Sequence, residues 1–377
     1  MEEQKKIVYI YSDNLRKQCD RIPTMLNRAS VVQDLISSYE IMSSKKLLIV
    51  QSLDATEEEL KLFHSSDFID FMKRINDSDE FEKYEDEQEE FGLGYDCPIL
   101  DKHYDFVKTL AGGSLTAAKI LARGKCHVAI NWFGGWHHAQ RDSAAGFCYV
   151  NDIVLAIQKL TETFNKILYV DLDIHHGDGV QNAFEFSKKI LTLSFHKLMP
   201  GFFPGTGRLE DCGSCKGKYY SINVPVLEGV SDTTFLKFFI TVLPRVMEAF
   251  QPEALVVQCG ADSLNGDEIG QSNLTLKSVG ECIKKILEYR KPTLFCGGGG
   301  YNFANTARLW TYLTSIIVEQ DIDNDIPDSS EFFTNYGPTY ELHIDTGNQK
   351  DLNTDKYISE VVGTVSSYCV FIQNDHV

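Results

Sequence analysis

The residues best suited to chemistry stand together in one stretch, Asp171-Leu172-Asp173-Ile174-His175-His176-Gly177-Asp178-Gly179. This stretch follows a short apolar run, 167–170, of the kind that forms a buried strand. Because side chains alternate along a strand, we expect Asp171, Asp173 and His175 to point the same way. Two carboxylates and an imidazole on one face could bind a divalent metal ion. A lone Asp-x-Asp is more often a solvated turn, so this interpretation depends on the rest of the chain.

Three further apolar runs also end in residues that could take part in a reaction. They are the runs 126–132, 254–258 and 293–296, followed by His137-His138, by Asp262 and by Gly297-Gly298-Gly299-Gly300-Tyr301. In an open parallel α/β sheet, ligands bind beyond the carboxyl ends of the strands. We therefore expect the four segments to meet at one site.

Three of these residues, Asp173, His175 and Asp262, would suit a catalytic metal ion. Three protein ligands leave an open position for water, as catalytic zinc sites do. One nitrogen and two oxygens also suit Fe(II) or Co(II), which could compete with zinc. A bound metal ion polarises a carbonyl and lowers the pKa of its water to about 7.

The pair His137-His138 would then transfer protons, although a His-His pair alone is more often a surface feature or a satisfied core pair. Each imidazole needs a carboxylate on its other nitrogen, and Asp171 and Asp178 are the acids left over in the metal stretch. Tyr301 could donate a hydrogen bond to a developing oxyanion. The glycines before it could cradle a phosphate or line a narrow pocket, but they lack a phosphate-binding fingerprint.

Composition limits the class of protein. The chain has 377 residues, 43% of them hydrophobic, which is enough for a large core. The formal net charge of −18 argues against direct binding to nucleic acid and would attract cationic partners such as lysine-rich peptides. No apolar run reaches the roughly 18 residues that cross a bilayer. The charged start, residues 1–6, lacks the apolar region of a signal peptide, so we expect an intracellular protein without a membrane partner.

The ten cysteines fit that compartment. Most lie in apolar stretches, where they act as small buried hydrophobes; these are Cys126, Cys148, Cys259, Cys282 and Cys296. Cys212 and Cys215 form a lone Cys-x-x-Cys in a Gly-rich loop. We expect a plain loop there, with redox sensitivity as the alternative.

Apolar strands alternate with helical patterns through most of the chain. The helical patterns cover 106–121, 147–160, 235–250, 278–289 and 305–318. Strands that are hydrophobic on both faces and separated by helices predict a mostly parallel multi-stranded sheet with helices on both faces. No repeat or linker divides the chain, so we predict a single large α/β domain over residues 1–377. The acidic segment 76–90 is expected to be a solvated loop or a short helix.

Several long motifs resemble the class I metal-dependent histone deacetylases. They are Gly134-Gly135-Trp136-His137-His138-Ala139, Gly146-Phe147-Cys148-Tyr149-Val150-Asn151-Asp152, the stretch 171–179, the loop 200–207, and 297–302. The resemblance covers nearly the whole chain and implies an arginase-like α/β deacetylase domain that hydrolyses acetyl-lysine amides. Its implied partners are acetylated lysine peptides and proteins, including histone tails, without an obligate corepressor. It further implies chromatin regulation, transcription repression, and location in the nucleus and cytoplasm.

The resemblance also assigns roles to individual residues. It implies zinc bound by Asp173, His175 and Asp262, and catalysis by His137 and His138 with Asp171 and Asp178 as their partners. It implies that Tyr301 polarises the acetyl carbonyl and that Asp96 grips the substrate backbone. The implied walls of the acyl-lysine channel are Gly146, Phe147 and Phe203, with Gly299 beside them, and Arg28 is placed near the exit route for acetate.

Structural potassium is implied at two sites. The residues of the first site are Asp171, Asp173, His175, Ser194 and Phe195, in part through backbone carbonyls. The residues of the second site are Phe184, Ser187, Ile190 and Tyr220.

The chain departs from the family pattern at the channel rim. Ile269 replaces a methionine or leucine, and its neighbours in 265–272 differ too, which concerns substrate preference rather than chemistry. Two alternatives stay open. An acetylpolyamine deacetylase of the same fold would use acids at the rim, for which Asp267 and Glu268 are candidates. A catalytically dead acetyl-lysine or corepressor-binding module is disfavoured by the intact histidines, ligands and Tyr301.

Overall fold

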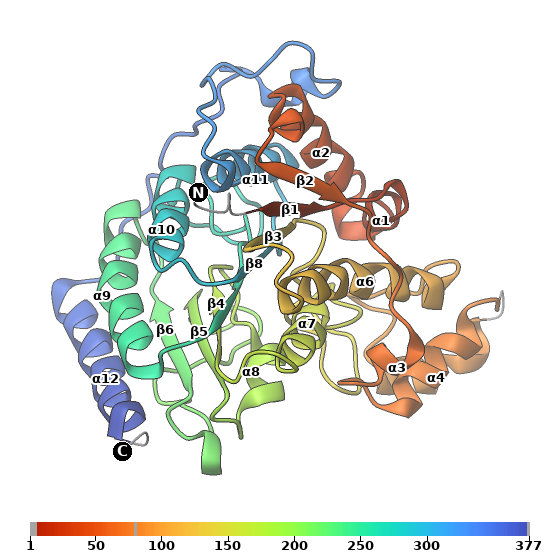
Figure 1. Ribbon diagram of the computed structural model, residues 1–377, viewed down its shortest axis with the longest axis horizontal. Helices are drawn as coiled ribbons and strands as arrows, with labels where there is room; N and C mark the ends of the chain where they lie inside the picture. The colour runs from red at the N-terminus through yellow and green to blue at the C-terminus, as the bar shows by residue number, and fades with distance from the viewer. Residues whose placement is uncertain (1–5, 79–80, 375–377) are drawn as a thin grey trace.

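The computed structural model describes residues 6–78 and 81–374. Within these residues, eight strands form one sheet in which all neighbouring strands run parallel. The strand order across the sheet is β2-β1-β3-β8-β7-β4-β5-β6 (Figure 1). The bounds are β1 Ile7–Ile10, β2 Leu47–Val50, β3 Val128–Asn131, β4 Ile167–Asp171, β5 Ile190–Lys197, β6 Ser221–Val226, β7 Ala254–Gln258 and β8 Thr293–Cys296.

Helices connect the strands, because parallel neighbours need crossover connections. Their bounds are α1 Asp13–Cys19, α2 Arg28–Ser38, α3 Glu57–Leu60, α4 Ser66–Ile75, α5 Glu85–Glu90, α6 His103–Ala122, α7 Asp152–Leu160, α8 Asp178–Phe184, α9 Asp232–Phe250, α10 Leu276–Glu288, α11 Phe303–Val318 and α12 Asp355–Asn374.

Both faces of the sheet are covered by helices. On one face, strand residues such as Tyr9 and Val170 pack in a core with α2, α9, α10 and α11, and α12 packs on the outside of α9. On the other face, Val8 and Tyr169 pack against α6, α7 and α8 (Figure 1). Successive strand residues thus enter opposite cores, as the two-residue period of a strand requires. This arrangement confirms the predicted α/β class.

The four strands that precede the candidate site residues are neighbours. In sheet order they are β3, β8, β7 and β4, at the centre of the sheet. Their carboxyl ends therefore emerge side by side, where parallel α/β sheets bind ligands. The strand order thus brings the four segments to one edge of the sheet, as expected from the sequence.

Some elements differ from the sequence expectation. The helix expected from residue 147 begins only at Asp152, because Ala145 and Cys148 form an isolated bridge and Asn151 accepts a hydrogen bond from the Val154 amide as N-cap. The strands β2 and β6 and the helix α12 are not indicated by the sequence patterns described above. In the acidic segment, residues 79–80 lie outside the described residues; the remainder contains a 3-10 turn, Phe81–Tyr84, and α5, so it is largely helical.

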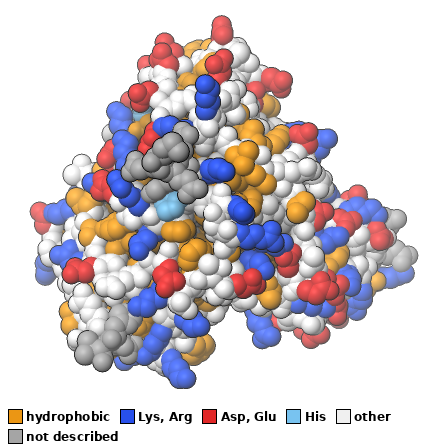
Figure 2. Space-filling model, in the orientation of Figure 1, with side chains coloured by type: hydrophobic (Ala, Val, Ile, Leu, Met, Phe, Trp, Pro, Cys, Tyr) orange, Lys and Arg blue, Asp and Glu red, His pale blue; other side chains and the backbone are white. Residues whose placement is uncertain are grey.

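Three observations concern surface charge, membrane-spanning helices and cysteines. On the face shown in Figure 2, basic and acidic side chains are interspersed, so the net charge of −18 does not form one continuous acidic patch there. None of the described helices is long and apolar enough to cross a membrane. All ten cysteines are free thiols; Cys212 is half-buried and Cys215 is exposed.

Candidate metal centre and active site

Three buried side chains from two strand ends converge as a potential metal site. The β4 strand ends at Asp171, so Asp173 and His175 reach the site from the loop that follows rather than from the strand itself. His175 Nδ1 lies 3.1 Å from Asp173 Oδ1 and 3.0 Å from Asp262 Oδ2. One ligand atom from each residue lies within 4.8 Å of the others, and all three side chains are buried. They form the one such cluster within residues 6–78 and 81–374.

The chemistry of this donor set fits a divalent cation. Burial and the adjacent charge of Asp173 raise the pKa of the Asp262 carboxyl, because two ionised carboxylates this close repel each other away from water. A cation among the three side chains would relieve that repulsion. One imidazole and two carboxylates are also ligands that zinc and similar metals accept.

The ligand carboxylates are held by hydrogen bonds that leave them little freedom. Asp173 Oδ2 accepts from Gln258 Nε2 at 2.7 Å and from the Gly299 amide at 2.9 Å. Asp262 Oδ1 accepts from the Ile174 amide at 3.1 Å. Donors of this kind orient a metal ligand and are part of the site. Asp173, which follows β4, is thus held by Gln258 at the end of β7 and by the Gly299 amide after β8.

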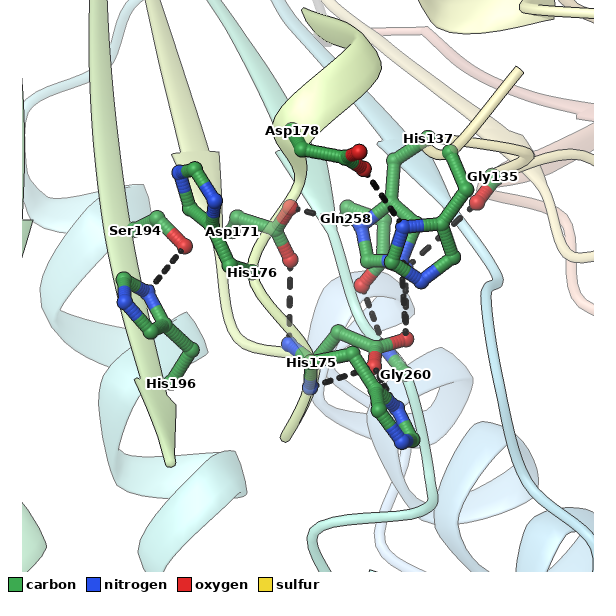
Figure 3. A network of polar contacts seen from close by, with 12 residues as sticks. Gly135, His137, Asp171, His175, His176, Asp178, Ser194, His196, Gln258 and Gly260 are labelled. Atoms are coloured by element: carbon green, nitrogen blue, oxygen red, sulfur yellow. Dashed lines mark hydrogen bonds and ion pairs between the residues drawn. The ribbon is translucent and has the colours of Figure 1, made fainter. Parts of the chain in front are cut away.

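The paired histidines lie beside the metal cluster, with their ring centroids 4.0 Å apart. His137 belongs to the polar network drawn in Figure 3, together with Asp171, His175 and Gln258. His137 Nδ1 donates to Asp171 Oδ2 at 2.8 Å, and His138 Nδ1 donates to Asp178 Oδ1 at 2.7 Å. The two Nε2 atoms are 3.0 Å apart. Each imidazole therefore binds a carboxylate through Nδ1. Its Nε2 faces the Nε2 of the other imidazole, so one proton can lie between the two rings.

The surroundings make these two imidazoles unequal. Burial alone would lower the pKa of His137, but the negative charges of Asp171 and Asp173 outweigh it and raise this pKa to about 9. Burial and the neighbouring His137 lower the pKa of His138 to about 4, against the hydrogen bond to Asp178. Without a bound metal ion, these surroundings favour protonation of His137 over His138.

Tyr301 lines the site, and Arg28 binds the backbone of the glycines that precede it. Tyr301 shares one pocket with the histidine pair and the three metal-site residues. Burial, followed by the charges of Asp262 and Asp173, raises the pKa of the Tyr301 phenol, so the hydroxyl keeps its proton and can donate. Arg28 is buried; its Nη1 donates to the carbonyls of Gly298 and Gly300, both at 3.0 Å, and its guanidinium lies over the Trp310 ring.

Two aromatic side chains lie against residues that line the pocket. The Phe203 ring centroid lies 4.9 Å from that of His138, and the Phe147 ring lies 5.7 Å from that of Tyr301. Asp96 Oδ2 accepts a hydrogen bond from the Gly146 amide at 2.7 Å, which ties the loop of Asp96 to the segment that carries Phe147. Gly146 has a φ of +54°, and a Cβ there would lie 2.7 Å from the His138 ring, so a residue with a side chain would crowd this ring.

Parts of both predicted potassium sets are neighbours in the fold. Asp171 and Ser194 are register partners on β4 and β5, and Phe195 follows on β5. In the second group, the Ser187 amide donates to the Phe184 carbonyl, and the Thr192 amide donates to the Tyr220 carbonyl. Each of these carbonyls keeps a second lone pair, as a carbonyl ligand for a cation needs.

Three side chains that support the site were not predicted from the sequence. Gln258 binds Asp173 and accepts from the Gly260 amide at 2.7 Å, Tyr169 donates to Asp171 at 2.6 Å, and Gln140 donates to Asp178 at 3.0 Å. A signal was present for Gln258, a polar residue that ends an otherwise apolar run. Tyr169 and Gln140 carry no such signal, because their roles depend on the folded chain.

Comparison with known proteins gives one consistent result. A family model described as "Histone deacetylase domain" matches residues 21–317. The chain is 44% identical to histone deacetylase 8 of Xenopus tropicalis over 369 residues, which are 98% of this chain and 99% of that protein. It is 45% identical to histone deacetylase 8 of Danio rerio over 96% of this chain and 94% of that protein. It is 39% identical to histone deacetylase 1 of Homo sapiens over 95% of this chain and 74% of that protein.

Proposed function

Because the chain belongs to the histone deacetylase family, we propose that it hydrolyses the amide of acetyl-lysine side chains in histones and other proteins, with zinc as its metal ion. The observation that carries this proposal is the shared pocket of Tyr301, the histidine pair and the three metal-site residues. The identity to the histone deacetylase 8 relatives is higher than that to histone deacetylase 1, which favours the histone deacetylase 8 branch of class I.

Asp173, His175 and Asp262 would hold the metal ion, with His175 offering Nδ1. A divalent ion bound there supplies Lewis acidity for the acetyl carbonyl and for the attacking water. Fe(II) and Co(II) remain alternatives, because the donor set contains two oxygens and one nitrogen. The rest of the reaction depends on the side chains around this centre.

The histidine pair would manage the protons. A water proton taken up at Nε2 of the pair can be returned to the lysine nitrogen when the C–N bond breaks, which releases acetate and free lysine. Asp171 and Asp178 hold the imidazoles through Nδ1, so both Nε2 atoms face the pocket. Tyr301 would donate its hydroxyl proton as a hydrogen bond to the carbonyl oxygen as negative charge develops there.

The entrance suits a long aliphatic side chain. Phe147 and Phe203 would contact its methylene groups, while Gly146 and Gly299 would let the acyl end pass. Asp96 would accept hydrogen bonds from the substrate backbone while its Oδ2 binds the Gly146 amide. Arg28 would lie on the route by which acetate leaves.

The acetylpolyamine alternative loses one of its two supporting residues. Asp267 is buried and its carboxylate is taken up by backbone amides, so it presents no charge to a polyamine. Glu268 remains exposed at the rim. Intact ligands, histidines and Tyr301 continue to argue against a catalytically dead binding module.

Further parts of the proposal concern the surroundings of the enzyme. Potassium would bind at the two carbonyl-rich places described above and stabilise the fold. Histone substrates would make the protein a chromatin regulator that acts in transcription repression, in the nucleus and cytoplasm, without an obligate corepressor. Replacing potassium by tetramethylammonium should lower the melting temperature of the protein if these two cation sites exist.

The decisive experiment compares two substrates. Purified protein is given an acetyl-lysine histone-tail peptide or acetylspermidine, with and without a chelator, followed by zinc, Fe(II) or Co(II). We expect turnover of the peptide, its loss with the chelator, and its return with zinc. Preference for acetylspermidine would support the polyamine enzyme. Binding of the peptide without turnover of either substrate under any metal would support the binding module.

A further inference from the structure

A carboxylate outside the metal ligands joins two segments of the site. Asp267 is 5% exposed, and its two oxygens accept four backbone hydrogen bonds. Oδ1 accepts from the amides of Ile269 and Gly270, both at 2.9 Å. Oδ2 accepts from the amides of Tyr301 at 2.7 Å and Asn302 at 3.3 Å. One side chain therefore links the turn that carries the rim residue Ile269 to the backbone of Tyr301.

The segment before Tyr301 needs such a restraint. Gly300 has a φ of +137°, in a region that residues with side chains rarely adopt, and its Cβ position would meet Thr306 Oγ1 at 2.4 Å. A glycine next to Tyr301 leaves the backbone free to rotate unless other groups hold it. The Gly299 amide is held by Asp173 Oδ2, and the Tyr301 amide is held by Asp267 Oδ2.

Other contacts between the same two segments do not reach Tyr301. Asn302 Nδ2 donates to the Gly266 carbonyl at 3.0 Å, and Asn305 Nδ2 donates to the Asn265 carbonyl at 3.1 Å. These bonds join α11 to the turn but leave the Tyr301 amide untouched. Arg28 Nη1 donates to the Gly300 carbonyl, the other end of the peptide group that carries the Tyr301 amide. Asp267 is therefore the side chain that holds the amide end of this peptide group and also binds the rim turn.

We infer that Asp267 is a positioning residue for Tyr301. By holding the Tyr301 backbone, Asp267 keeps the phenol hydroxyl within hydrogen-bond reach of the place that the acetyl carbonyl oxygen will occupy. It also couples Tyr301 to the rim turn at Ile269. This inference rests on the proposed deacetylase function. A carboxylate is needed because all four partners are N–H donors and a charged acceptor binds them more strongly than a neutral one. Misplacement of a reacting group by about 1 Å can cost roughly 100-fold in rate.

The test begins with Asp267→Asn in the full chain. The amide keeps one oxygen and turns an NH₂ group toward two N–H donors, so the Tyr301 backbone loses its fixed acceptor. We expect kcat on an acetyl-lysine peptide to fall roughly 10- to 100-fold, with KM within about twofold and metal content unchanged. A kcat within about twofold of the wild type would overturn the inference.

A double variant separates positioning from a general structural defect. In the Tyr301→Phe background the hydroxyl is already gone, so adding Asp267→Asn should cost less than about threefold more. Equal losses in both backgrounds would mean that Asp267 only stabilises the fold. Asp351→Asn is the matched control, because Asp351 also accepts backbone amides, from Ser231 and Asn353, away from the site. It should leave kcat per folded molecule unchanged.

Two further measurements decide the question if Asp267→Asn does not fold or if its activity alone is ambiguous. If Asp267→Asn does not fold, Asp267→Glu retains the charge and displaces it by one methylene, and an intermediate loss of kcat is expected. A crystal structure of the variant should show Tyr301 displaced or in several positions, and an unchanged Tyr301 would contradict the inference without reference to activity. Wild-type protein that deacetylates neither substrate would reject the proposed function alone.

Discussion

The floor and the rim of the active site are built differently. We define the site floor as His137, His138, Asp173, His175 and Asp262, and the site rim as Asp96, Phe203 and Ile269. Every floor residue is at most 5% exposed, whereas Phe203 and Ile269 are 45% and 38% exposed. Each floor side chain also has polar partners at 2.7–3.1 Å.

This difference separates what each region can control. Floor residues have one geometry, because their buried polar groups need all of their hydrogen bonds. Exposed rim residues can change rotamer to suit different substrates at little cost. The floor should therefore set metal binding and turnover, and the rim should set substrate affinity. Substitutions in the two regions can test this division.

The largest effect is expected at the floor, for Asp262→Asn. The change removes a charged ligand and leaves His175 Nδ1 with one carboxylate instead of two. We expect metal affinity to fall by more than about 100-fold, beyond the usual cost of losing a residue that only supports a ligand. Turnover should fall by more than about 10³-fold, measured beside metal content.

Asp232→Asn is a suitable control for that variant. Asp232 accepts hydrogen bonds from the Thr275 amide and the Ser278 hydroxyl, and it does not line the site. Its metal content and turnover should match the wild type. Full metal occupancy in Asp262→Asn would remove Asp262 from the ligand set and weaken the definition of the floor.

The next largest effect is expected for Tyr301→Phe, which tests the inner wall between floor and rim. Only a hydroxyl is lost, so metal content and KM should stay close to the wild type. The cost of one oxyanion donor is roughly 10²–10³ in kcat. Tyr336→Phe removes another buried hydroxyl, one that does not line the site, and should leave kcat unchanged. Turnover near that of the wild type would reject the role given to Tyr301.

The floor was far more accessible to sequence reasoning than its supports. Asp173, His175 and Asp262 each follow an apolar run, and the rule that ligands bind at the carboxyl ends of parallel strands placed them together. The neighbouring order of β3, β8, β7 and β4 could not be deduced, because strand order is set by long-range packing. The class of fold followed from the alternating pattern.

The supporting residues were missed for a physical reason. Gln140 and Asp267 act through bonds to residues far away in the chain, at Asp178 and Tyr301. Such contacts leave no local periodicity. Asp267 was even assigned to the rim surface in the polyamine alternative, whereas the structure buries it beneath the rim. The helix start at Asp152 was missed because the apolar residues before it pack at the site instead of in a helix. Phe147 lies beside Tyr301, and Cys148 lines the pocket.

At the rim, Asp96→Asn should change affinity rather than turnover. The neutral amide can still accept from the Gly146 amide but binds a substrate backbone more weakly than a carboxylate does. We expect KM for an acetyl-lysine peptide to rise roughly tenfold, with kcat within about threefold. Asp101→Asn, at an exposed position nearby, should change neither value. A large fall in kcat at constant KM would place Asp96 with the floor.

The smallest effect is expected for Ile269→Met, which restores the residue type that the family pattern places at this position. The side chain is partly exposed, and the swap conserves hydrophobic volume, so stability should hardly change. Met is more flexible, and it should favour peptides with bulky apolar residues beside the acetyl-lysine by roughly twofold to threefold in kcat/KM. A panel of peptides that differ only in flanking residues measures this ratio. If kcat fell by the same factor for every peptide, the turn held by Asp267 would be transmitting the change to Tyr301, and rim and floor would not be independent.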